Sequence, residues 1–206
     1  MIWRKTMEPL VAEVKSNVSS NPSMTLWFTG LSGAGKSTLA QALHTRLFDQ
    51  GRTCVILDGD HLRQGLNSDL GFSAVDRREN IRRVAEVAKI FNNIGVTVIT
   101  ALISPMADDR RLARSIIGEA HFRELYICAS LEVCEARDPK GLYAKARSGL
   151  IPNFTGVCAP YEPPKSAALV VHTGVVSIDH AVEQLLEIFI SSQQYNAESL
   201  RSMHNQ

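Results

Sequence analysis

The feature that most constrains this chain is a glycine-rich segment close to its amino end. The letters GLSGAGKST begin at Gly30 and match the pattern G-x-x-x-x-G-K-[ST]. An apolar run at residues 26–29 precedes the segment, and a stretch with leucines at positions 39, 43 and 47, one face of a helix, follows it. Strand, loop and helix in this order are the context that a phosphate-binding loop requires. The sequence therefore predicts such a loop, rather than a merely glycine-rich turn.

The chemistry of phosphate binding explains this residue pattern. Glycines allow successive backbone N–H groups to converge on phosphate oxygens, and the amino end of the following helix carries a partial positive charge. Lys36 is expected to span the β- and γ-phosphates of ATP, and Ser37 to ligate Mg²⁺. The predicted ATP-binding residues of the loop are Gly30, Leu31, Ser32, Gly33, Ala34, Gly35, Lys36, Ser37 and Thr38.

Four further apolar runs repeat the pattern of the first predicted strand. They lie at residues 54–57, 96–101, 125–128 and 169–171, and stretches of helical periodicity separate them. Helices are clearest at residues 81–91 and at 178–189, the latter with Ser177 as its predicted N-cap. Short buried strands that alternate with helices indicate an α/β protein with a parallel sheet. We therefore predict the P-loop nucleoside triphosphate hydrolase fold, with a parallel five-stranded core sheet flanked by helices.

The length of 206 residues suits one domain, which we place at residues 23–190. Residues 1–22 and 191–206 are polar, and we expect both segments to be flexible. Between about residues 138 and 164 the helical periodicity fails, and glycines and prolines interrupt the chain. Long irregular inserts in compact domains are usually functional. We interpret this insert as a mobile lid over the site rather than as a plain surface excursion.

Charge and cysteine content narrow the range of partners and compartments. The formal net charge is +1 at pH 7, so we do not expect nucleic acid as a partner. The four cysteines form no C-x-x-C pair, which indicates reduced thiols in a cytoplasmic protein rather than a zinc site or disulfides. No apolar run reaches about 18 residues, so we expect neither secretion nor a membrane span.

Two acidic residues follow the second predicted strand, in the turn Asp58-Gly-Asp60, whereas Ser104 follows the third. Because parallel strands end at one edge of the sheet, all three side chains are expected near the phosphate-binding loop. A carboxylate there can deprotonate an acceptor hydroxyl or hold a water on Mg²⁺. Turn chemistry alone is the alternative for either aspartate. For Ser104 the alternative is a helix start, with Ser104 as N-cap and Pro105 at position N1.

Arginines are dense between residues 63 and 83. Arg63 and Arg77 flank a predicted loop above the site, at residues 67–72. Bidentate contacts from these two guanidinium groups would suit an anionic second substrate. For the other three arginines of the stretch we favour a solvated helix face, and these are Arg78, Arg82 and Arg83.

Six sequence blocks, in order, resemble one family, the adenylylsulfate (APS) kinases, which make 3′-phosphoadenosine 5′-phosphosulfate in sulfate assimilation. The resemblance runs from about residue 23 to residue 189. It implies transfer of the γ-phosphate of ATP to the 3′-hydroxyl of adenosine 5′-phosphosulfate. The blocks are GLSGAGKST from Gly30, DGD-x-x-R-x-GLN-x-DLGFS from Asp58, DR-x-ENIRR from Asp76, ISP from Ile103, RDPKGLY from Arg137 and FTG from Phe154.

The resemblance also implies roles by position. Asp58 would be the general base toward the 3′-hydroxyl and Asp60 would assist on the Mg²⁺ side, although which aspartate matters more stays open. Lys140 would be a lid lysine that approaches the phosphates and the acceptor, and Arg137 would bind ATP. The implied adenylylsulfate-binding residues, in which two phenylalanines sandwich the adenine, are Asp58, Arg63, Phe72, Arg77, Asn80, Ile103, Ser104, Lys140 and Phe154. The implied metal ligands are Ser37 and Asp60.

The match at Ser104 carries the family's proposal of a phosphoserine intermediate in bacterial members, which would make the chain a phosphoprotein. We expect direct in-line transfer instead, because phosphoryl transfer needs mainly positioning and charge stabilisation. In addition, no base adjoins Ser104 in the sequence to activate its hydroxyl. Two departures from the family pattern are His61 and Met106, and neither falls in the phosphate-binding loop or at the predicted base.

The resemblance implies a Mg²⁺-dependent homodimer that uses ATP and adenosine 5′-phosphosulfate, and functional coupling to a separate ATP sulfurylase. Two alternatives compete with this interpretation. Another small P-loop kinase, acting on a sugar acid, an antibiotic or a nucleotide, would share Lys36 but would lack the DLGFS and FTG blocks. A regulatory module that only binds ATP would have no reason to retain Asp58, Arg63 and Lys140 together.

Overall fold

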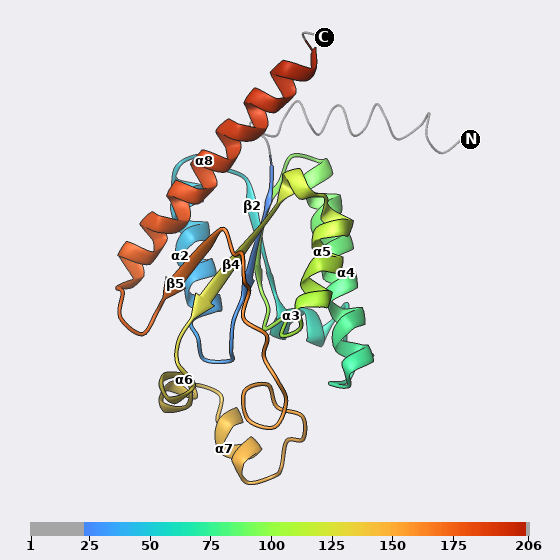
Figure 1. Cartoon of the computed structure of the whole chain (residues 1–206), viewed down its shortest axis with the longest axis vertical. Coiled ribbons are helices and arrows are strands. Elements are labelled where there is room, and N and C mark those ends of the chain that lie inside the picture. The colour runs from blue at the N-terminus through green and yellow to red at the C-terminus, as the bar shows by residue number, and fades with distance from the viewer. Residues whose placement is uncertain (1–22, 205–206) are drawn as a thin grey trace, which may run out of the picture.

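The computed structural model describes residues 23–204, and one five-stranded sheet organises them (Figure 1). All neighbouring strands pair in parallel, in the order β2-β3-β1-β4-β5. The predicted parallel five-stranded sheet is therefore confirmed. Its strands are β1 (Thr25–Thr29), β2 (Cys54–Asp58), β3 (Thr97–Ala101), β4 (Phe122–Cys128) and β5 (Leu169–His172).

Helices cover both faces of the sheet (Figure 1). One face carries α2 and α8, which contact each other, and the other carries α4 and α5. Two short helices, α6 and α7, lie beyond the carboxyl ends of the strands (Figure 1). The helices are α2 (Lys36–Asp49), α3 (Gly59–Gln64), α4 (Ala74–Asn93), α5 (Ala107–Ile117), a single 3₁₀ turn (Glu119–His121), α6 (Leu131–Arg137), α7 (Leu142–Arg147) and α8 (Ile178–His204).

The central strand β1 shows why the core divides into two layers. All five of its residues are buried, and successive side chains point to opposite faces. Leu26 and Phe28 belong to the cluster under α2 and α8, whereas Trp27 belongs to the cluster under α4 and α5. Each such fully buried side chain contributes about 1.5–3 kcal/mol to stability. A strand that is apolar on both faces can therefore sit only at the middle of this fold.

Helix starts follow the predictions at one position and depart from them at another. The hydroxyl of Ser177 accepts a hydrogen bond from the His180 amide at 3.2 Å, so its predicted N-cap role is confirmed. The predicted N-cap at Ser104 is wrong, because α5 begins at Ala107. The Ser104 hydroxyl is engaged elsewhere, since it accepts a hydrogen bond from the Trp27 indole at 3.2 Å. Its backbone takes a left-handed φ of 38° instead of the extended N-cap conformation.

Both ends of the chain were predicted to be flexible, and the structure describes only the carboxyl-terminal one, as far as residue 204. The predicted flexible segment 1–22 lies outside the described residues. At the other end, α8 does not stop near residue 190, where the composition turns polar, but continues to His204. Polarity alone does not end a helix, and neither glycine nor proline occurs after residue 190. The predicted tail is therefore helical from 191 to 204.

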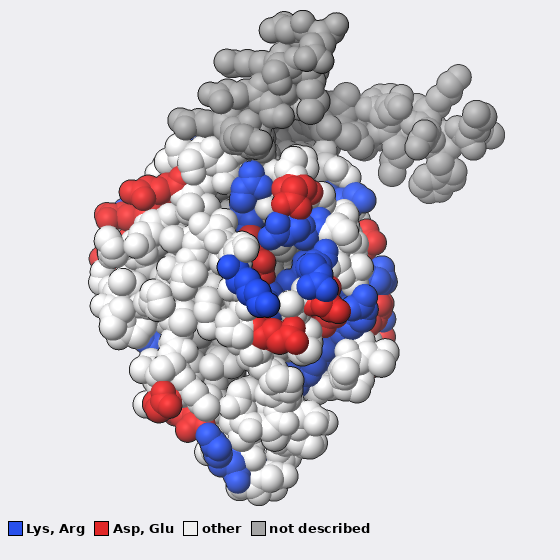
Figure 2. All heavy atoms as spheres, viewed as in Figure 1, with Lys and Arg blue, Asp and Glu red and all other residues white. Residues whose placement is uncertain are grey.

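The segment predicted as a lid, residues 138–164, lies at the carboxyl end of the sheet (Figure 1). It contains α7 and a tight turn in which Thr155 and Ala159 form a backbone bridge. Charged side chains of both signs gather over α5 on the face drawn in Figure 2. Exposed residues of α5 form ion pairs such as Arg111–Asp108 and Arg114–Glu119. Among the described helices, none is both long and apolar enough to cross a membrane.

Candidate active site

A cavity of about 790 Å³ opens at the carboxyl edge of the sheet, where the sequence places the site. Most of the predicted site residues line it, and four predicted residues do not: Gly30, Leu31, Ala34 and Asp58. The predicted residues in its wall are Ser32, Gly33, Gly35, Lys36, Ser37, Thr38, Asp60, Arg63, Phe72, Arg77, Asn80, Ile103, Ser104, Arg137, Lys140 and Phe154.

The glycines of the phosphate-binding loop are required by its geometry. Gly33 and Gly35 have φ values of 75° and 93°, a backbone region that other residues rarely adopt. Gly30 is needed for a second reason, because a Cβ at this position would lie 2.2 Å from the carbonyl oxygen of Ile127. The loop can therefore pass close to β4 only with glycine at its start.

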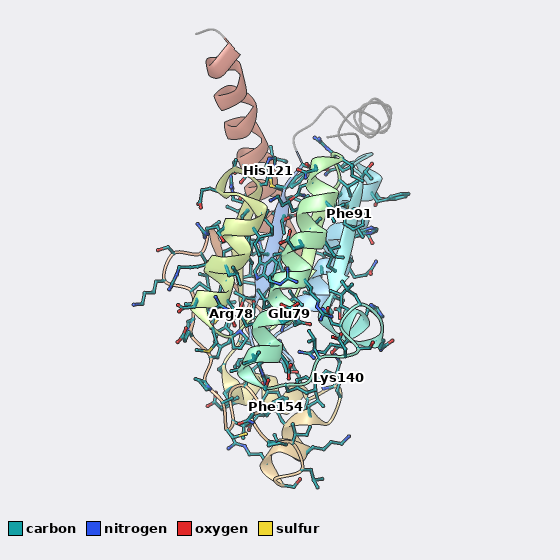
Figure 3. All side chains as sticks on the ribbon, turned by 90° about the vertical axis from the view of Figure 1, so that its right-hand side faces the viewer. Arg78, Glu79, Phe91, His121, Lys140 and Phe154 are labelled. Atoms are coloured by element: carbon teal, nitrogen blue, oxygen red, sulfur yellow. The ribbon has the colours of Figure 1, made fainter. Side chains whose placement is uncertain are left out.

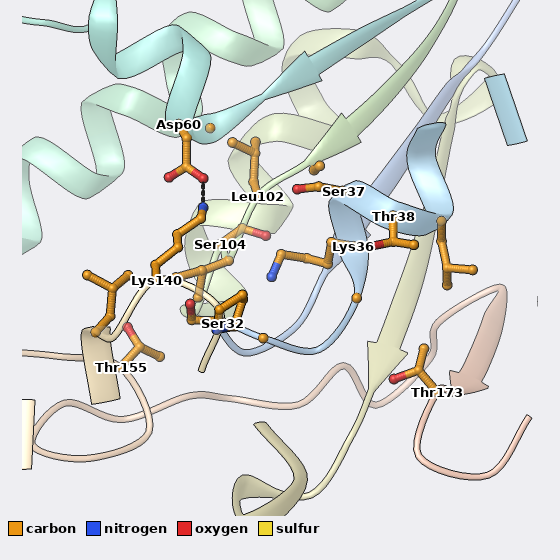
Figure 4. Close-up of a pocket in the computed structure, with 18 of the residues that line it drawn as sticks. Ser32, Lys36, Ser37, Thr38, Asp60, Leu102, Ser104, Lys140, Thr155 and Thr173 are labelled. Atoms are coloured by element: carbon orange, nitrogen blue, oxygen red, sulfur yellow. Dashed lines mark hydrogen bonds and ion pairs between the residues drawn. The ribbon is translucent and has the colours of Figure 1, made fainter. Parts of the chain in front are cut away.

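Lys36 turns its amino group toward the cavity (Figure 4) and bonds the loop itself. Its Nζ atom donates to the carbonyl oxygens of Gly30 and Leu31 at 2.9 and 2.7 Å. The side chain is buried, and this burial lowers the pKa of Lys36 to about 8. The amino group lies where phosphate oxygens of a nucleotide could replace the two carbonyl partners.

Two side chains that also line the cavity hold carbonyl groups of the phosphate-binding loop. Arg137 donates to the Gly33 carbonyl at 3.3 Å, and the Thr173 hydroxyl donates to the Ala34 carbonyl at 2.8 Å. Arg137 also bonds Thr173, through its hydroxyl at 3.2 Å and its carbonyl at 2.6 Å. Because C=O and N–H point in opposite directions in a trans peptide, these two hydrogen bonds also fix the directions of the Ala34 and Gly35 amides. Arg137, predicted to bind ATP, thus also shapes the loop.

The cavity has one half beside the phosphate-binding loop and one half beside Phe72 and Phe154. Ser37 lines the first half, and Asp58, which itself does not line the cavity, contacts Ser37. The Ser37 hydroxyl donates to Asp58 Oδ2 at 2.6 Å. The other oxygen of Asp58 caps α3 by accepting from the Asp60 amide at 2.9 Å. Asp60 itself forms an ion pair with Lys140 of the lid (Figure 4). The structure therefore places Asp58, and not Asp60, against the predicted metal ligand Ser37.

The two arginines predicted for an anionic substrate hold the loop before α4. The guanidinium carbon of Arg63 lies 4.3 Å from the centre of the Phe72 ring. Arg77 donates to the Phe72 carbonyl at 2.9 Å and reaches the lid through the Thr155 hydroxyl at 2.7 Å. Burial lowers the pKa of both guanidinium groups, yet both remain charged at neutral pH. Phe72 is 61% exposed, so one predicted wall of the adenine site is open to solvent.

Asn80 and Ser104 lie deeper in the cavity wall. The Oδ1 atom of Asn80 accepts a hydrogen bond from the Asn67 amide at 3.0 Å, which leaves the amide hydrogens of Asn80 to donate to a ligand. Ser104 is only 2% exposed. Its described hydroxyl contact is to Trp27, which donates and cannot take a proton. No hydrogen-bond partner described for the Ser104 hydroxyl within residues 23–204 can therefore act as a base for a nucleophile.

The structure adds wall residues that the sequence reasoning missed. Five of them follow β5 and begin α8, beside the phosphate-binding loop, and these are Thr173, Val176, Ser177, Ile178 and Ala181. The rule that ligands bind at the carboxyl ends of parallel strands could have identified Thr173, because it comes directly after the fifth strand. The sequence marks Ser177 as an N-cap and residues 178–189 as a helix, but no residue pattern marks the other four as cavity residues.

The remaining arginines of α4 form ion pairs and do not line the cavity, as the helix-face interpretation predicts. Arg83 pairs with Asp69 at 2.7 Å and with Glu79 at 2.9 Å, and Arg82 pairs with Glu79 at 2.7 Å. Arg78 pairs with Asp109 on α5 at 2.8 Å. Figure 3 shows Lys140 and Phe154 at the lid end of the molecule and His121 at the opposite end.

Comparison with known proteins gives a consistent result. The family described as Adenylylsulphate kinase matches residues 22–172. An adenylyl-sulfate kinase from Prochlorococcus marinus is 53% identical over 190 residues, which are 92% of this chain and 94% of that protein.

Two solved structures share the fold and a substantial part of the sequence. The APS kinase of Mycobacterium tuberculosis in complex with AMPPNP and APS is 44% identical, with a TM-score of 0.79, over 82% of this chain and 98% of that one. A hexameric APS kinase from Thiobacillus denitrificans is 34% identical, with a TM-score of 0.63, over 84% of this chain and 30% of that one. Sequence, fold and the architecture of the cavity thus agree that the chain belongs to the adenylylsulfate kinase family.

Proposed function

We propose that this chain transfers the γ-phosphate of ATP directly to the 3′-hydroxyl of adenosine 5′-phosphosulfate, with Asp58 as the general base. The observation that carries the assignment of the base is the 2.6 Å contact between Ser37 and Asp58. Ser37 belongs to the ATP loop, and Asp58 comes from the strand next to the acceptor half of the cavity. We infer that this carboxylate reaches a hydroxyl that approaches the γ-phosphate, because Asp58 contacts Ser37 in the cavity wall.

The donor half of the cavity is suited to a triphosphate. Amides of the phosphate-binding loop and the amino end of α2 surround the place where phosphates would lie. Lys36 supplies a positive charge there, and Arg137 holds the Gly33 carbonyl of the loop. The new wall residues that follow Thr173 lie beside this loop. We infer that they contact the nucleoside of ATP, because the triphosphate end is already accounted for.

The residues around Ser37 fit Mg²⁺. Ser37 and Asp58 offer hard oxygen donors, a hydroxyl and a carboxylate. No group of three or more His, Cys, Asp or Glu that could hold a metal occurs within residues 23–204, but Mg²⁺ commonly uses one or two protein oxygens together with phosphates and water. Mg²⁺, when bound with ATP, neutralises charge on the β- and γ-phosphate oxygens. We therefore assign Ser37 as the metal ligand, while Asp58 beside it stays the general base and Asp60 pairs with Lys140.

The acceptor half is suited to an aromatic base that carries anionic groups. Phe72 and Phe154 both line the cavity, and Arg63 and Arg77 place two cations beside Phe72. These residues match what a nucleotide with a negatively charged 5′ substituent requires. The Mycobacterium tuberculosis relative, solved with AMPPNP and APS, supports the same pair of ligands here.

Lys140 is positioned to serve both halves of the site. Its ion pair with Asp60 holds the lid across the cavity in this structure (Figure 4). A negatively charged γ-phosphate would compete with Asp60 for the same ammonium group. We infer that Lys140 leaves Asp60 and stabilises the charge that spreads over the transferring phosphoryl group.

We propose further that the chain works as a homodimer in the cytoplasm and takes its acceptor from an ATP sulfurylase. A hexameric relative supports self-association, and four free cysteines within residues 23–204 suit a reducing compartment. Light scattering of the purified protein would give its mass in solution. A dimer mass supports the proposal, and a monomer mass contradicts it.

The deciding experiment measures ADP release with Mg·ATP and either adenosine 5′-phosphosulfate or AMP at matched low micromolar concentrations. We expect strong turnover only with the sulfated acceptor, and a loss of about 10²–10⁴-fold in Asp58→Asn, the range for a general base. Asp60→Asn, measured alongside, should lose less if Asp58 is the base. Equal turnover with AMP, or none with adenosine 5′-phosphosulfate, would contradict the acceptor assignment.

A further inference from the structure

Tyr143, on the lid helix α7, touches both halves of the site although it does not line the cavity. The side chain is 2% exposed. Its hydroxyl donates to the carbonyl oxygen of Ser32 in the phosphate-binding loop at 2.9 Å. Its ring lies edge-on to Phe154, with ring centres 5.0 Å apart and planes at 80°. One buried residue therefore connects the ATP loop to the wall of the acceptor half.

The contact with Ser32 fixes a peptide that faces phosphate. The Ser32 carbonyl is held from the lid side, so the amide of Gly33, on the same planar peptide, points in the opposite direction. Gly33 lines the cavity and has no side chain between its amide and a ligand. Burial raises the pKa of Tyr143, so its hydroxyl keeps its proton and remains a donor. Tyr143 thereby complements Arg137 and Thr173, which hold the next two carbonyls.

The contact with Phe154 fixes an aromatic wall. Phe154 is 8% exposed and lines the cavity. An edge-to-face contact with a second ring restricts the tilt of the first and contributes about 0.5–1.5 kcal/mol beyond simple burial. Rotation of the Tyr143 ring would change the surface that Phe154 presents to an acceptor base.

Hydrogen bonds to one carboxylate fix the backbone around Tyr143. The carboxylate of Asp138 accepts hydrogen bonds from the amides of Leu142, Tyr143 and Ala144 at 2.8–3.1 Å. These are the first three residues of α7, whose amides have no partner within the helix. The backbone position of Tyr143 is thus set independently of its side-chain contacts, which are with Ser32, Phe154 and the Cys134 thiol.

We propose that Tyr143 is a positioning residue that couples the shape of the phosphate-binding loop to the position of Phe154. The part of the proposal that concerns Phe154 rests on the function proposed above, whereas the part that concerns the phosphate-binding loop does not. When a nucleotide binds and the Ser32 carbonyl moves, the Tyr143 ring moves with it and changes the position of Phe154. Tyr143 touches neither substrate, so its effect appears in binding and not in the chemical step.

Two variants separate the two contacts. Tyr143→Phe removes only the hydroxyl, and we expect the Kd for ADP, measured by titration calorimetry, to rise about threefold to tenfold, as for one lost hydrogen bond. The KM for adenosine 5′-phosphosulfate should stay within about twofold, because the ring contact remains. Tyr143→Leu removes both contacts, so it should raise the KM for the acceptor by a further factor of about three to ten.

Tyr161→Phe is the matched control. It removes a tyrosine hydroxyl from the other end of the lid segment, where that hydroxyl lies 3.0 Å from the Thr29 hydroxyl. We expect it to lower the melting temperature about as much as Tyr143→Phe while leaving the Kd for ADP unchanged.

A purely structural role for Tyr143 would lower the melting temperature of both Tyr143 variants without raising either constant, and that result would overturn the proposal. An unchanged Kd for ADP in Tyr143→Phe would overturn the loop contact even if the ring contact held. The ADP titration needs no acceptor, so it tests the contact between Tyr143 and the phosphate-binding loop even if the acceptor assignment is wrong.

Discussion

At the scale of single residues, the protonation state of Lys36 depends on whether a nucleotide is bound. Burial brings its pKa down to about 8, so the free protein loses this charge as the pH rises through that value. Bound phosphates favour the ammonium form and raise the pKa. We therefore expect ADP affinity to fall above pH 8, and ADP binding near pH 8 to take up a proton.

Calorimetric titrations of ADP in two buffers with different ionisation enthalpies would measure this proton uptake. Lys36→Met is the control, because it removes the titrating group. Identical proton uptake in the variant and the natural protein would assign the effect to another residue.

Ser104 gives a second residue-scale prediction. We expect Ser104→Ala to keep kcat within about tenfold, because it loses one hydrogen bond, to Trp27, worth about 1 kcal/mol. Loss of an obligatory nucleophile would instead remove nearly all turnover. Single-turnover kinetics with labelled ATP would also show whether a phosphorylated protein forms. A phosphoserine at position 104 that forms and decays at the rate of turnover would refute direct transfer.

Residue identities in the site were largely predictable, whereas their pairing was not. Motif spacing identified Lys36, Ser37 and Asp58 from the sequence, because phosphate and metal chemistry admit few side chains. Motif spacing did not predict that Ser37 bonds Asp58 or that Asp60 pairs with Lys140. Those pairings depend on the direction of each side chain at the end of β2, which no sequence spacing encodes.

At the scale of elements, α7 is a helix of six residues whose first turn is held by one carboxylate. Asp138→Ala removes the acceptor for three backbone amides of that turn. We expect faster amide hydrogen exchange over residues 142–147 and a higher KM for both substrates, because Lys140 and Tyr143 flank the start of α7. Hydrogen-exchange mass spectrometry would test this expectation.

Asp138→Asn is the graded comparison for the same position, because its amide keeps one acceptor oxygen. It should show exchange between that of the natural protein and that of Asp138→Ala. Unchanged exchange over residues 142–147 in Asp138→Ala would mean that the helix does not depend on this cap.

Helices and strands with a clear apolar pattern were predicted from the sequence, whereas the shortest helices were not. All five strands and the long helices α2, α4 and α8 repeat an apolar pattern that burial imposes. Helix α7 is too short for such a pattern and is stabilised by a side chain outside it. Ser104 does not cap α5, because its φ of 38° is not the extended N-cap conformation and the helix begins later, at Ala107 after Met106.

At the scale of the whole molecule, Arg110 joins parts of the fold that are far apart in the chain. Its guanidinium is 3% exposed and pairs with Glu124 on β4 at 2.5 Å. It also donates to the carbonyls of Ser104 and Glu162, at 2.8 and 2.7 Å. One side chain therefore ties α5, the sheet, the cavity wall and the end of the lid together.

We expect Arg110→Met to lower the free energy of unfolding by about 3–5 kcal/mol, because it leaves Glu124 without its buried partner. Arg111→Ala, which removes an ion pair exposed on both sides, should change it by less than about 1 kcal/mol. Urea unfolding followed by circular dichroism would compare the two. A small effect of Arg110→Met would show that Arg114, which also contacts Glu124 at 3.5 Å, compensates.

The hydrogen bond between Thr173 and the Ala34 carbonyl has a consequence for the order of events during protein synthesis. The nucleotide loop is translated early, yet one of its supports comes from a residue 139 positions later. Domains form as units once their chain is available. A ribosome-bound nascent chain that stops short of β5 should therefore fail to retain ATP, and nucleotide capture should begin only after residue 173 has left the exit tunnel.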